Sequence, residues 1–290
     1  MNAASLAPAN SLRTRLIALT LLTGVLLPSL VNAQATPYPR AGWQATLTTN
    51  AHGVRGTVTI VDADTFRIDD FYYDGGGINV HFIVAPQDTR TSFVSNRIVT
   101  DRNFLGTAFS GGSATVDLPT GTTLDGHNAV SLWCIPASAN FGSGTFRSPL
   151  EVWRQANFGT VTNSGNAANA ADSDRDGVPN LLEYATRTNP ISASGSPLNA
   201  PSNVILPSSV PARQLTFNIR SNANDIHYVI QRSLDLSTWT EVYRNNRSTG
   251  AISRAAGVTS VEDHSAQTIA VTDSAAATSA FWRLVIEPAT

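Results

Sequence analysis

Two blocks of short segments with apolar residues at every second position constrain the fold most strongly. In the first block, residues 56–147, such alternation occurs in residues 78–84, 114–118 and 129–135. A glycine-rich break at residues 74–77 precedes the first of these runs. Period-two alternation interrupted by turn signals is typical of strands that bury one face. The block therefore predicts an N-terminal β-sandwich or barrel-like domain over residues 36–148.

The second block predicts a small C-terminal β-sandwich over residues 214–290, because alternation returns in residues 215–219, 226–230 and 281–286. The segment between the blocks, 149–191, has helical spacing in residues 150–158. A short second helix is expected over residues 179–186, where Pro179 suits a first helical turn. A stretch rich in Ser, Pro and Asn, residues 192–213, predicts a linker. The expected fold class is mainly β, with a short helical segment between two β domains.

The N-terminus has the pattern of a signal peptide over residues 1–33. Arg13 and Arg15 precede an apolar run at residues 16–30, and small residues follow up to Ala33. Cleavage is expected after Ala33 or Ala35, which predicts a secreted, cell-surface or periplasmic protein. An uncleaved N-terminal anchor is the alternative, although the apolar run is short for a membrane span.

Composition excludes several classes of function. All 19 basic residues are arginine, so no lysine is present for Schiff-base chemistry. A chain with 21 acidic residues and a net charge of −2 lacks the basic surface that nucleic-acid binding needs. No nucleophile elbow, zinc-protease, P-loop or dinucleotide-binding motif occurs. Hydrolase and dehydrogenase activities therefore have no motif support, and the protein is at most an electron-transfer module.

Cys134 is the single cysteine of the chain, which is unusual for a protein with an export signal. Three explanations remain open: a buried apolar filler, a partner in an intermolecular disulfide, or a redox or metal-binding group. Cys134 shares strand parity with Val130 and Leu132, so we expect it on the core face of its strand, with Trp133 pointing the opposite way. A thiol in such a position is often a small hydrophobic residue.

An acidic segment between the two β blocks has the spacing of a calcium-binding loop. Oxygen ligands at alternate positions of a tight loop suit Ca²⁺, and a glutamate at position 12 adds a bidentate carboxylate. The expected ligands are Asp172, Asp174, Asp176, Val178 through its carbonyl, Asn180 and Glu183. The segment resembles the calcium loops of thrombospondin type-three repeats and dockerin-like linkers. That resemblance implies a structural calcium ion, and a solvated turn without metal is the alternative.

Several motifs of the first domain occur in the order of a known family. They are residues 52–58 (HGVRGTV), 65–68 (TFRI), 71–75 (FYYDG), 132–134 (LWC) and 140–142 (NFG). Together they resemble the DM-thirteen family, which is described as an electron-transfer domain, over residues 51–146. The resemblance implies a redox role for Cys134, with His52 as candidate second ligand and haem or copper as candidate cofactors. His81 is a weaker candidate for the second ligand.

The C-terminal block resembles β-modules that follow calcium loops in exported proteins of Verrucomicrobia-like bacteria. The residues that carry this resemblance are 228–233 (YVIQRS), 236–240 (LSTWT) and 281–284 (FWRL). It implies an accessory at the bacterial cell surface or in sorting. The sequence thus predicts an exported protein with an electron-transfer domain and an unidentified redox or cell-surface partner. The alternative is a non-catalytic structural or adhesive surface protein in which Cys134 only fills the core.

Overall fold

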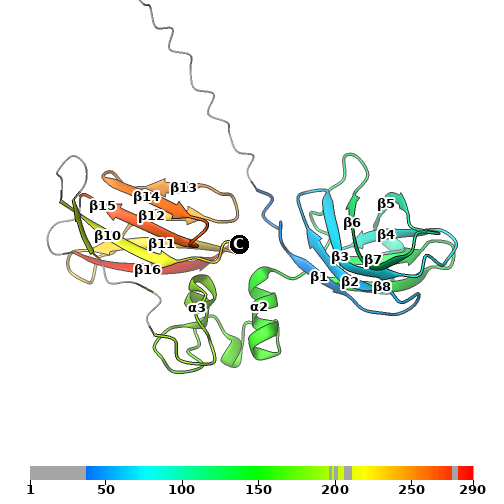
Figure 1. Ribbon diagram of the computed structural model, residues 1–290, viewed down its shortest axis with the longest axis horizontal. Coiled ribbons are helices and arrows are strands. Elements are labelled where there is room, and N and C mark those ends of the chain that lie inside the picture. The colour runs from blue at the N-terminus through cyan, green and yellow to red at the C-terminus, as the bar shows by residue number, and fades with distance from the viewer. Residues whose placement is uncertain (1–36, 196–197, 199–201, 206–210, 276–279, 290) are drawn as a thin grey trace, which may run out of the picture. The chain divides into compact units, whose positions relative to one another are not determined.

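The computed structural model describes residues 37–195, 198, 202–205, 211–275 and 280–289. The expected signal peptide, residues 1–33, lies outside the described residues. The described chain is mainly β, as expected, and its strands form four antiparallel sheets of four strands each (Figure 1). No described helix has both the length and the apolar character that crossing a bilayer requires.

The N-terminal domain contains two of these sheets. One sheet has the order β1 (Gln44–Leu47), β2 (Arg55–Ile60), β3 (Thr65–Tyr73), β6 (Phe109–Asp117). The other has the order β5 (Ile98–Asn103), β4 (Val80–Ala85), β7 (Ala129–Cys134), β8 (Ala139–Thr145). A short helix, α1 (Arg90–Ser95), packs against β4.

The two sheets enclose one apolar core and meet along one side of the domain. Apolar side chains from both sheets, among them Phe66 and Phe82 with rings 5.7 Å apart, fill the space between them. Beyond β1, the amide of Thr48 donates to the carbonyl of Ser143 over 2.8 Å, and that of Ala51 to Phe141 over 2.9 Å. This contact between the β1 segment and β8 closes one side of the sandwich.

Glycines in β8 make this closure possible. A Cβ atom on Gly142 would lie 2.5 Å from the carbonyl oxygen of Thr48, and one on Gly144 would lie 2.4 Å from that of Thr46. Both distances are far below van der Waals contact with backbone atoms that cannot rotate away. Only glycine therefore fits at these two positions without separating the strands.

We expect Gly142→Ala to lower the free energy of unfolding by about 1–3 kcal/mol, because the added methyl group forces β8 away from the β1 segment. Gly112→Ala is the matched control, since its Cβ atom would meet only a ring carbon of Phe109 at 3.6 Å. Urea denaturation of both variants measures the difference. Equal stability of the two variants would contradict this account of the closure.

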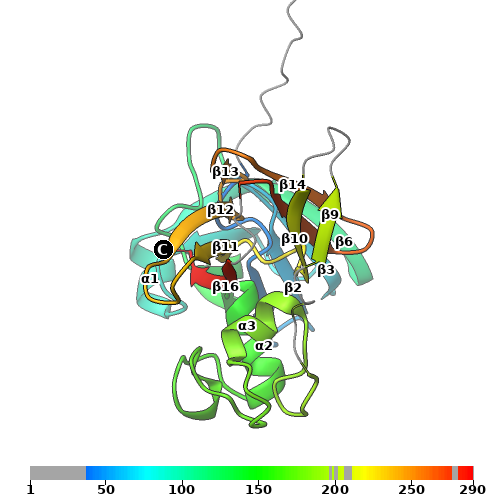
Figure 2. The same cartoon turned by 90° about the vertical axis from the view of Figure 1, so that its left-hand side faces the viewer.

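A helical segment follows the first domain and packs against the second. Its elements are α2 (Pro149–Phe158), a 3₁₀ turn η1 (Gly165–Ala167) and α3 (Asn180–Thr186). Ser148 and Glu151 form a capping box at the start of α2, and Gly159 ends it in a left-handed conformation. Both expected helices are therefore confirmed within one residue. Figures 1 and 2 show α2 and α3 side by side next to the C-terminal strands.

The C-terminal domain is a second sandwich, as expected. One sheet has the order β14 (Val258–Asp263), β15 (Thr268–Asp273), β10 (Pro211–Asn218), β9 (Ser202–Ile205). The other has the order β13 (Ile252–Arg254), β12 (Thr240–Asn246), β11 (Ile226–Ser233), β16 (Phe281–Pro288). Its core includes Trp153 of α2 and Tyr184 of α3 as well as strand residues.

The expected linker over residues 192–213 needs correction, because β9 and the start of β10 lie within it. Val204 of β9 pairs with Ala212 of β10 in antiparallel register. Composition suggested a linker because Ser, Pro and Asn disfavour strands. Pairing with β10 nevertheless supplies β9 with backbone hydrogen bonds, and a proline is tolerated at the first residue of a strand.

Candidate functional site

Cys134 ends β7 on the core face of its sheet, as predicted. It pairs with Val80 of β4 and Ala139 of β8, and only 2% of its surface is exposed. Val130 and Leu132 belong to the same core cluster, whereas Trp133 lies in a separate cluster on the other face. Every residue of β7 is buried. The thiol is therefore held at the end of a strand that is covered on both faces.

Backbone amides surround the sulfur of Cys134. Burial alone raises the pKa of the thiol, because it disfavours the charged form. Hydrogen bonding from the amides of Ala137, Ile78 and Asn79 outweighs this effect, and the net result is a lowered pKa. The carbonyl of Asn79 accepts the amide of Ile135 over 2.8 Å, which fixes this residue beside the end of β7. The arrangement favours a thiolate although the site is nearly closed to solvent.

Tyr73 lies beside a more exposed pair of side chains and is close enough to Cys134 to feel its charge. Its hydroxyl donates to the carbonyl of Gly76, and 2% of the residue is exposed. Burial, followed by the negative charges of Asp74 and Cys134, raises the pKa of Tyr73 to about 12. Tyr73 therefore stays protonated over the ordinary pH range, which leaves Cys134 as the group of this pair that ionises.

His52 and Asp74 form a hydrogen-bonded pair beside Tyr73. The Nδ1 atom of His52 lies 3.0 and 3.1 Å from the two carboxylate oxygens of Asp74, and its ring lies 4.1 Å from that of Phe141. The amide of Gly76 and the His52 ring hold the pKa of Asp74 below its ordinary value. An ionised Asp74 accepts the Nδ1 proton, so Nε2 of a neutral His52 carries the lone pair. This tautomer keeps His52 suited to the role of second ligand that the family resemblance implied.

The side chains around Cys134 do not form a ready-made metal site. In the described part of the chain, the one group of three or more His, Cys, Asp or Glu side chains whose ligand atoms lie within 4.8 Å consists of Asp172, Asp174 and Asp176. His81, the weaker candidate for a second ligand, has oxygen partners at both ring nitrogens, 2.7 and 2.8 Å away. A haem also needs open volume at its ligand, which a sulfur with 2% exposure does not offer. Haem and copper stay predictions for this site.

Residues 46–146 match the model of the family described as Electron transfer DM13. This match agrees with the resemblance found in the sequence and nearly coincides with its boundaries.

Two curated relatives are isoforms of one protein of Drosophila melanogaster. The chain is 33% identical over 142 residues to Protein Skeletor, isoforms B/C, and to Protein Skeletor, isoforms D/E. The aligned region covers 46% of this chain but 18% and 9% of the two Skeletor proteins. The chain thus spans less than a fifth of the length of these relatives.

The acidic loop brings the expected aspartates together. Asp172, Asp174 and Asp176 direct carboxylate oxygens to within 4.8 Å of one another. Backbone amides shape the loop: Asp172 accepts the amide of Gly177 over 2.9 Å, and Asp176 accepts that of Val178 over 2.9 Å. Gly177 has a positive φ of 91°, which gives the tight turn that the spacing predicted.

Two further expected ligands of the loop have buried oxygens without partners. Glu183 is fully buried, and neither of its carboxylate oxygens has a hydrogen-bond partner in the described part of the chain. The same holds for Oδ1 of Asn180, which is 1% exposed. Burial, followed by the negative charges of the three aspartates, raises the pKa of Glu183 to about 7. Burying a charged carboxylate without a partner costs folding free energy, and a bound cation would remove that cost.

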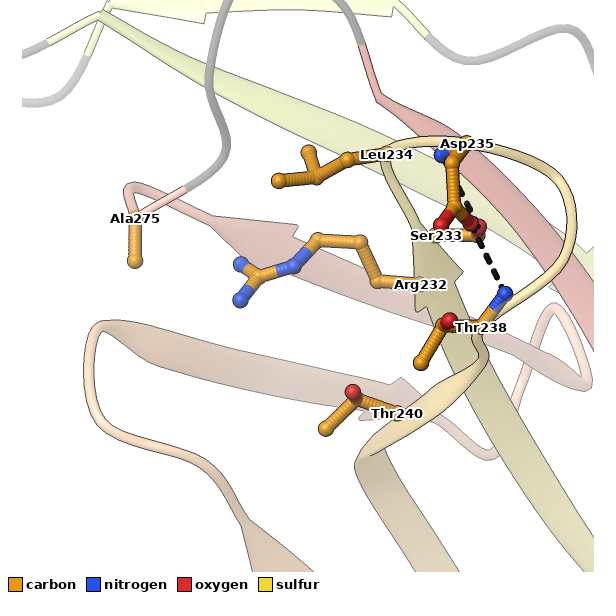
Figure 3. A pocket seen from close by; sticks show the side chains of 7 residues that line it. All are labelled: Arg232, Ser233, Leu234, Asp235, Thr238, Thr240 and Ala275. Carbon is orange, nitrogen blue, oxygen red and sulfur yellow. Dashed lines mark hydrogen bonds between the residues drawn. The ribbon is translucent and has the colours of Figure 1, made fainter.

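A separate cavity of about 390 Å³ lies in the C-terminal domain, between the β11–β12 loop and Ala275 (Figure 3). The guanidinium of Arg232 extends into it, and the hydroxyls of Thr238 and Thr240 line it. Arg232 also donates to the buried carboxylate of Asp273 over 2.7 Å. Because Asp273 compensates this charge, the cavity presents no strong electrostatic preference for a ligand.

We expect the Cys134 thiolate to form at lower pH than a free cysteine does. Ultraviolet absorbance of the thiolate measures this in the native protein, with Cys134→Ser as the blank. Because the folded protein binds the thiol proton more weakly than the unfolded one, the stability that the thiolate contributes is present at alkaline pH and lost as pH falls through the folded pKa. A midpoint at or above that of a free cysteine would refute the lowered pKa.

Proposed function

We propose that the N-terminal domain is a redox module that exchanges electrons through Cys134. The arrangement at the end of β7 supports this proposal, because backbone amides of Ala137, Ile78 and Asn79 hydrogen-bond the sulfur and favour its charged form. A packing residue needs no such stabilisation of its charged form, whereas a thiolate is the form that gives up an electron. The family description of residues 46–146, Electron transfer DM13, supports the same role.

The single cysteine limits which redox chemistry is compatible with this chain. A disulfide cycle within one chain needs two thiols, so Cys134 would exchange electrons with a partner outside this chain. With 2% exposure the sulfur does not meet a bulky partner directly. The half-exposed His52–Asp74 pair, in contact with Tyr73, offers the more accessible side of the site. We therefore propose an external redox partner that approaches on the His52 side.

A structural role is the second candidate function, and the burial of Cys134 favours it. A cysteine with 2% exposure among Val130 and Leu132 fills space as a small apolar side chain does. In that case the protein would be a structural or adhesive component of the cell surface.

Replacement of Cys134 separates the two candidate functions. If Cys134 exchanges electrons, Cys134→Ser abolishes the redox wave and any cofactor absorbance while the fold persists. If the thiol only packs, the same change costs about 1–3 kcal/mol of stability and removes no redox signal. Voltammetry and absorbance spectroscopy of the purified protein, with Cys134→Ala as a second variant without a hydroxyl, make the measurement.

We also propose that the acidic loop binds a structural calcium ion. Asp172, Asp174, Asp176, Asn180 and Glu183 would supply side-chain oxygens, and Val178 its carbonyl. The carboxylate of Glu183, which is buried and has no hydrogen-bond partner within the described ranges, supports this proposal best. An affinity in the range of roughly 10⁻⁴ to 10⁻³ M would suffice outside the cell.

Glu183→Gln is expected to weaken calcium binding by at least about tenfold, because it removes a charged bidentate ligand. Chelator should lower the melting temperature of the wild-type protein but leave that of the variant nearly unchanged. Glu241→Gln is the matched control, since this carboxylate pairs with Arg244 on the surface of β12. Calorimetry that detects no calcium uptake at millimolar concentration would exclude the site.

Export is the last part of the proposal and rests on the pattern of residues 1–33. The native protein is expected to begin at Gln34 or Thr36 and to be found outside the cytoplasm, either secreted or at the cell surface. Mass spectrometry of the mature N-terminus tests this, and a native protein that retains Met1 would argue against it.

A further inference from the structure

The cavity of about 390 Å³ beside the β11–β12 loop belongs to none of the functions proposed above (Figure 3). Pockets that hold small molecules in proteins have volumes of about 300–1,000 Å³. This cavity is therefore large enough for one small ring. Its lining combines charged, hydroxyl and apolar side chains, so the chemistry of these side chains decides which molecules fit.

The β11–β12 loop forms one wall of the cavity and is ordered by two of its own side chains. The hydroxyl of Ser233 accepts the amides of Asp235 over 3.2 Å and of Leu236 over 2.8 Å. Oδ1 of Asp235 accepts the amides of Ser237 over 2.9 Å and of Thr238 over 2.7 Å. These bonds hold the loop in one conformation without a ligand, so binding would cost little further ordering of the loop.

The buried carboxylate of Asp273 holds the opposite side of the cavity. Its Oδ2 accepts Nη1 of Arg232 over 2.7 Å, and its Oδ1 accepts the amide of Ala275 over 2.9 Å. The side chain of Arg232 is nevertheless 25% exposed, against 3% for that of Asp273. A guanidinium has five N–H groups. Beyond the bond to Asp273, the guanidinium of Arg232 has no acceptor among the described residues, so it has donors left for a ligand.

Two threonine hydroxyls complete the polar lining. Thr238 and Thr240 are exposed, and neither hydroxyl has a hydrogen-bond partner in the part of the chain that the structure describes. A hydroxyl can both donate and accept, whereas a guanidinium only donates. Leu234 lines the same cavity with an apolar side chain and is 65% exposed. The cavity thus offers donors, acceptors and one apolar surface to the same ligand.

The charges around the cavity disfavour a charged ligand. The charge of Arg232 is compensated by Asp273, and Arg213 lies opposite Asp273 in the β10–β15 ladder. Hydrogen bonds from the amides of Thr238 and Ser237 hold the pKa of Asp235 well below its ordinary value, so this lining residue is ionised. An anion would therefore meet Asp235, and a cation would meet Arg232. An uncharged molecule with several hydroxyl groups avoids both repulsions.

We propose that this cavity binds a neutral saccharide ring. Arg232 would donate to oxygens of the ring hydroxyls, and the hydroxyls of Thr238 and Thr240 would exchange hydrogen bonds with neighbouring ones. The C–H groups of the ring would lie against Leu234. Because a ring with adjacent hydroxyls contacts several of these groups at once, it is held better than separate water molecules. A ligand of this size is expected to bind weakly, with a dissociation constant of roughly 10⁻³ M.

Nuclear magnetic resonance of the backbone amides in the full chain tests the site. The probes are the methyl glycosides of glucose, galactose, mannose and N-acetylglucosamine at millimolar concentration, with glucuronate and inorganic phosphate as anionic comparisons. At least one neutral probe is expected to shift the amide signals of Thr238 and Ala275, which lie on the two sides of the cavity, and to do so more than either anion.

A trisaccharide that ends in the tightest-bound sugar identifies the source of the ligand. Binding at least as tight as that of the single sugar indicates the end of a polysaccharide, and weaker binding indicates a free sugar. Either result supports a saccharide site.

Thr240→Val is expected to weaken binding of that sugar about fivefold, the equivalent of one hydrogen bond between uncharged groups. Valine has nearly the shape of threonine, and the hydroxyl has no partner to lose within the described residues, so the fold should persist. Arg232→Lys keeps the charge beside Asp273 but lacks the planar fork, and it should weaken binding by at least as much. Thr259→Val, at an exposed position of β14, is the matched control and should bind as the wild type does.

The inference would be overturned if none of the four neutral sugars moves the signals of Thr238 and Ala275. Shifts that only glucuronate or phosphate produces would also overturn it, because the cavity would then be an anion site. Binding that Thr240→Val and Arg232→Lys leave unchanged would place the sugar elsewhere on the chain. Equal weakening in Thr240→Val and Thr259→Val would likewise argue against the site, since the effect would not depend on the cavity.

Discussion

The central constraint on the N-terminal domain is the burial of β7 on both faces. One face contributes Val130, Leu132 and Cys134 to the core between the sheets, and the other places Trp133 against Phe93 under α1. A strand covered on both faces cannot slip in register without exposing one apolar set or the other. The position of the sulfur relative to β4 is fixed for this reason. The amides that surround it are therefore available without any reorganisation of the backbone.

The acidic loop differs from the cysteine site in how its charges are balanced. The cysteine site is complete in protein atoms, because its donors come from the chain itself. The loop collects four carboxylates, and one of them, Glu183, is buried with no hydrogen-bond partner among the described residues. Protonation of Glu183, whose pKa is raised to about 7, relieves this repulsion, and a bound cation would relieve it as well. The two sites thus differ in what would change their charge: pH alone for the thiol, and both pH and a divalent cation for the loop.

Sequence periodicity predicted the strands that bury one apolar face, the two helices and the face on which Cys134 lies. It did not reveal β5 or β13, since edge strands with mostly exposed side chains show no apolar alternation. The sequence also could not predict that the amides of Ile78, Asn79 and Ala137 lie near the sulfur. They approach the sulfur from loops that only the pairing of β4, β7 and β8 brings together. Backbone donors have no signature in residue type, whereas the cluster of Asp172, Asp174 and Asp176 is formed by side chains and could therefore be predicted from their spacing.

The buried carboxylate of Asp225 has a consequence for how this chain can be divided. It accepts the amide of Leu150 in α2 over 2.7 Å and the hydroxyl of Tyr184 in α3 over 2.8 Å. A fragment that began at the C-terminal strands would lose both donors and uncover the apolar surface on which Trp153 packs. The smallest piece with an intact interior therefore starts near Ser148. A gene rearrangement that keeps this interior intact would have to move the two helices, the acidic loop and the second sandwich together.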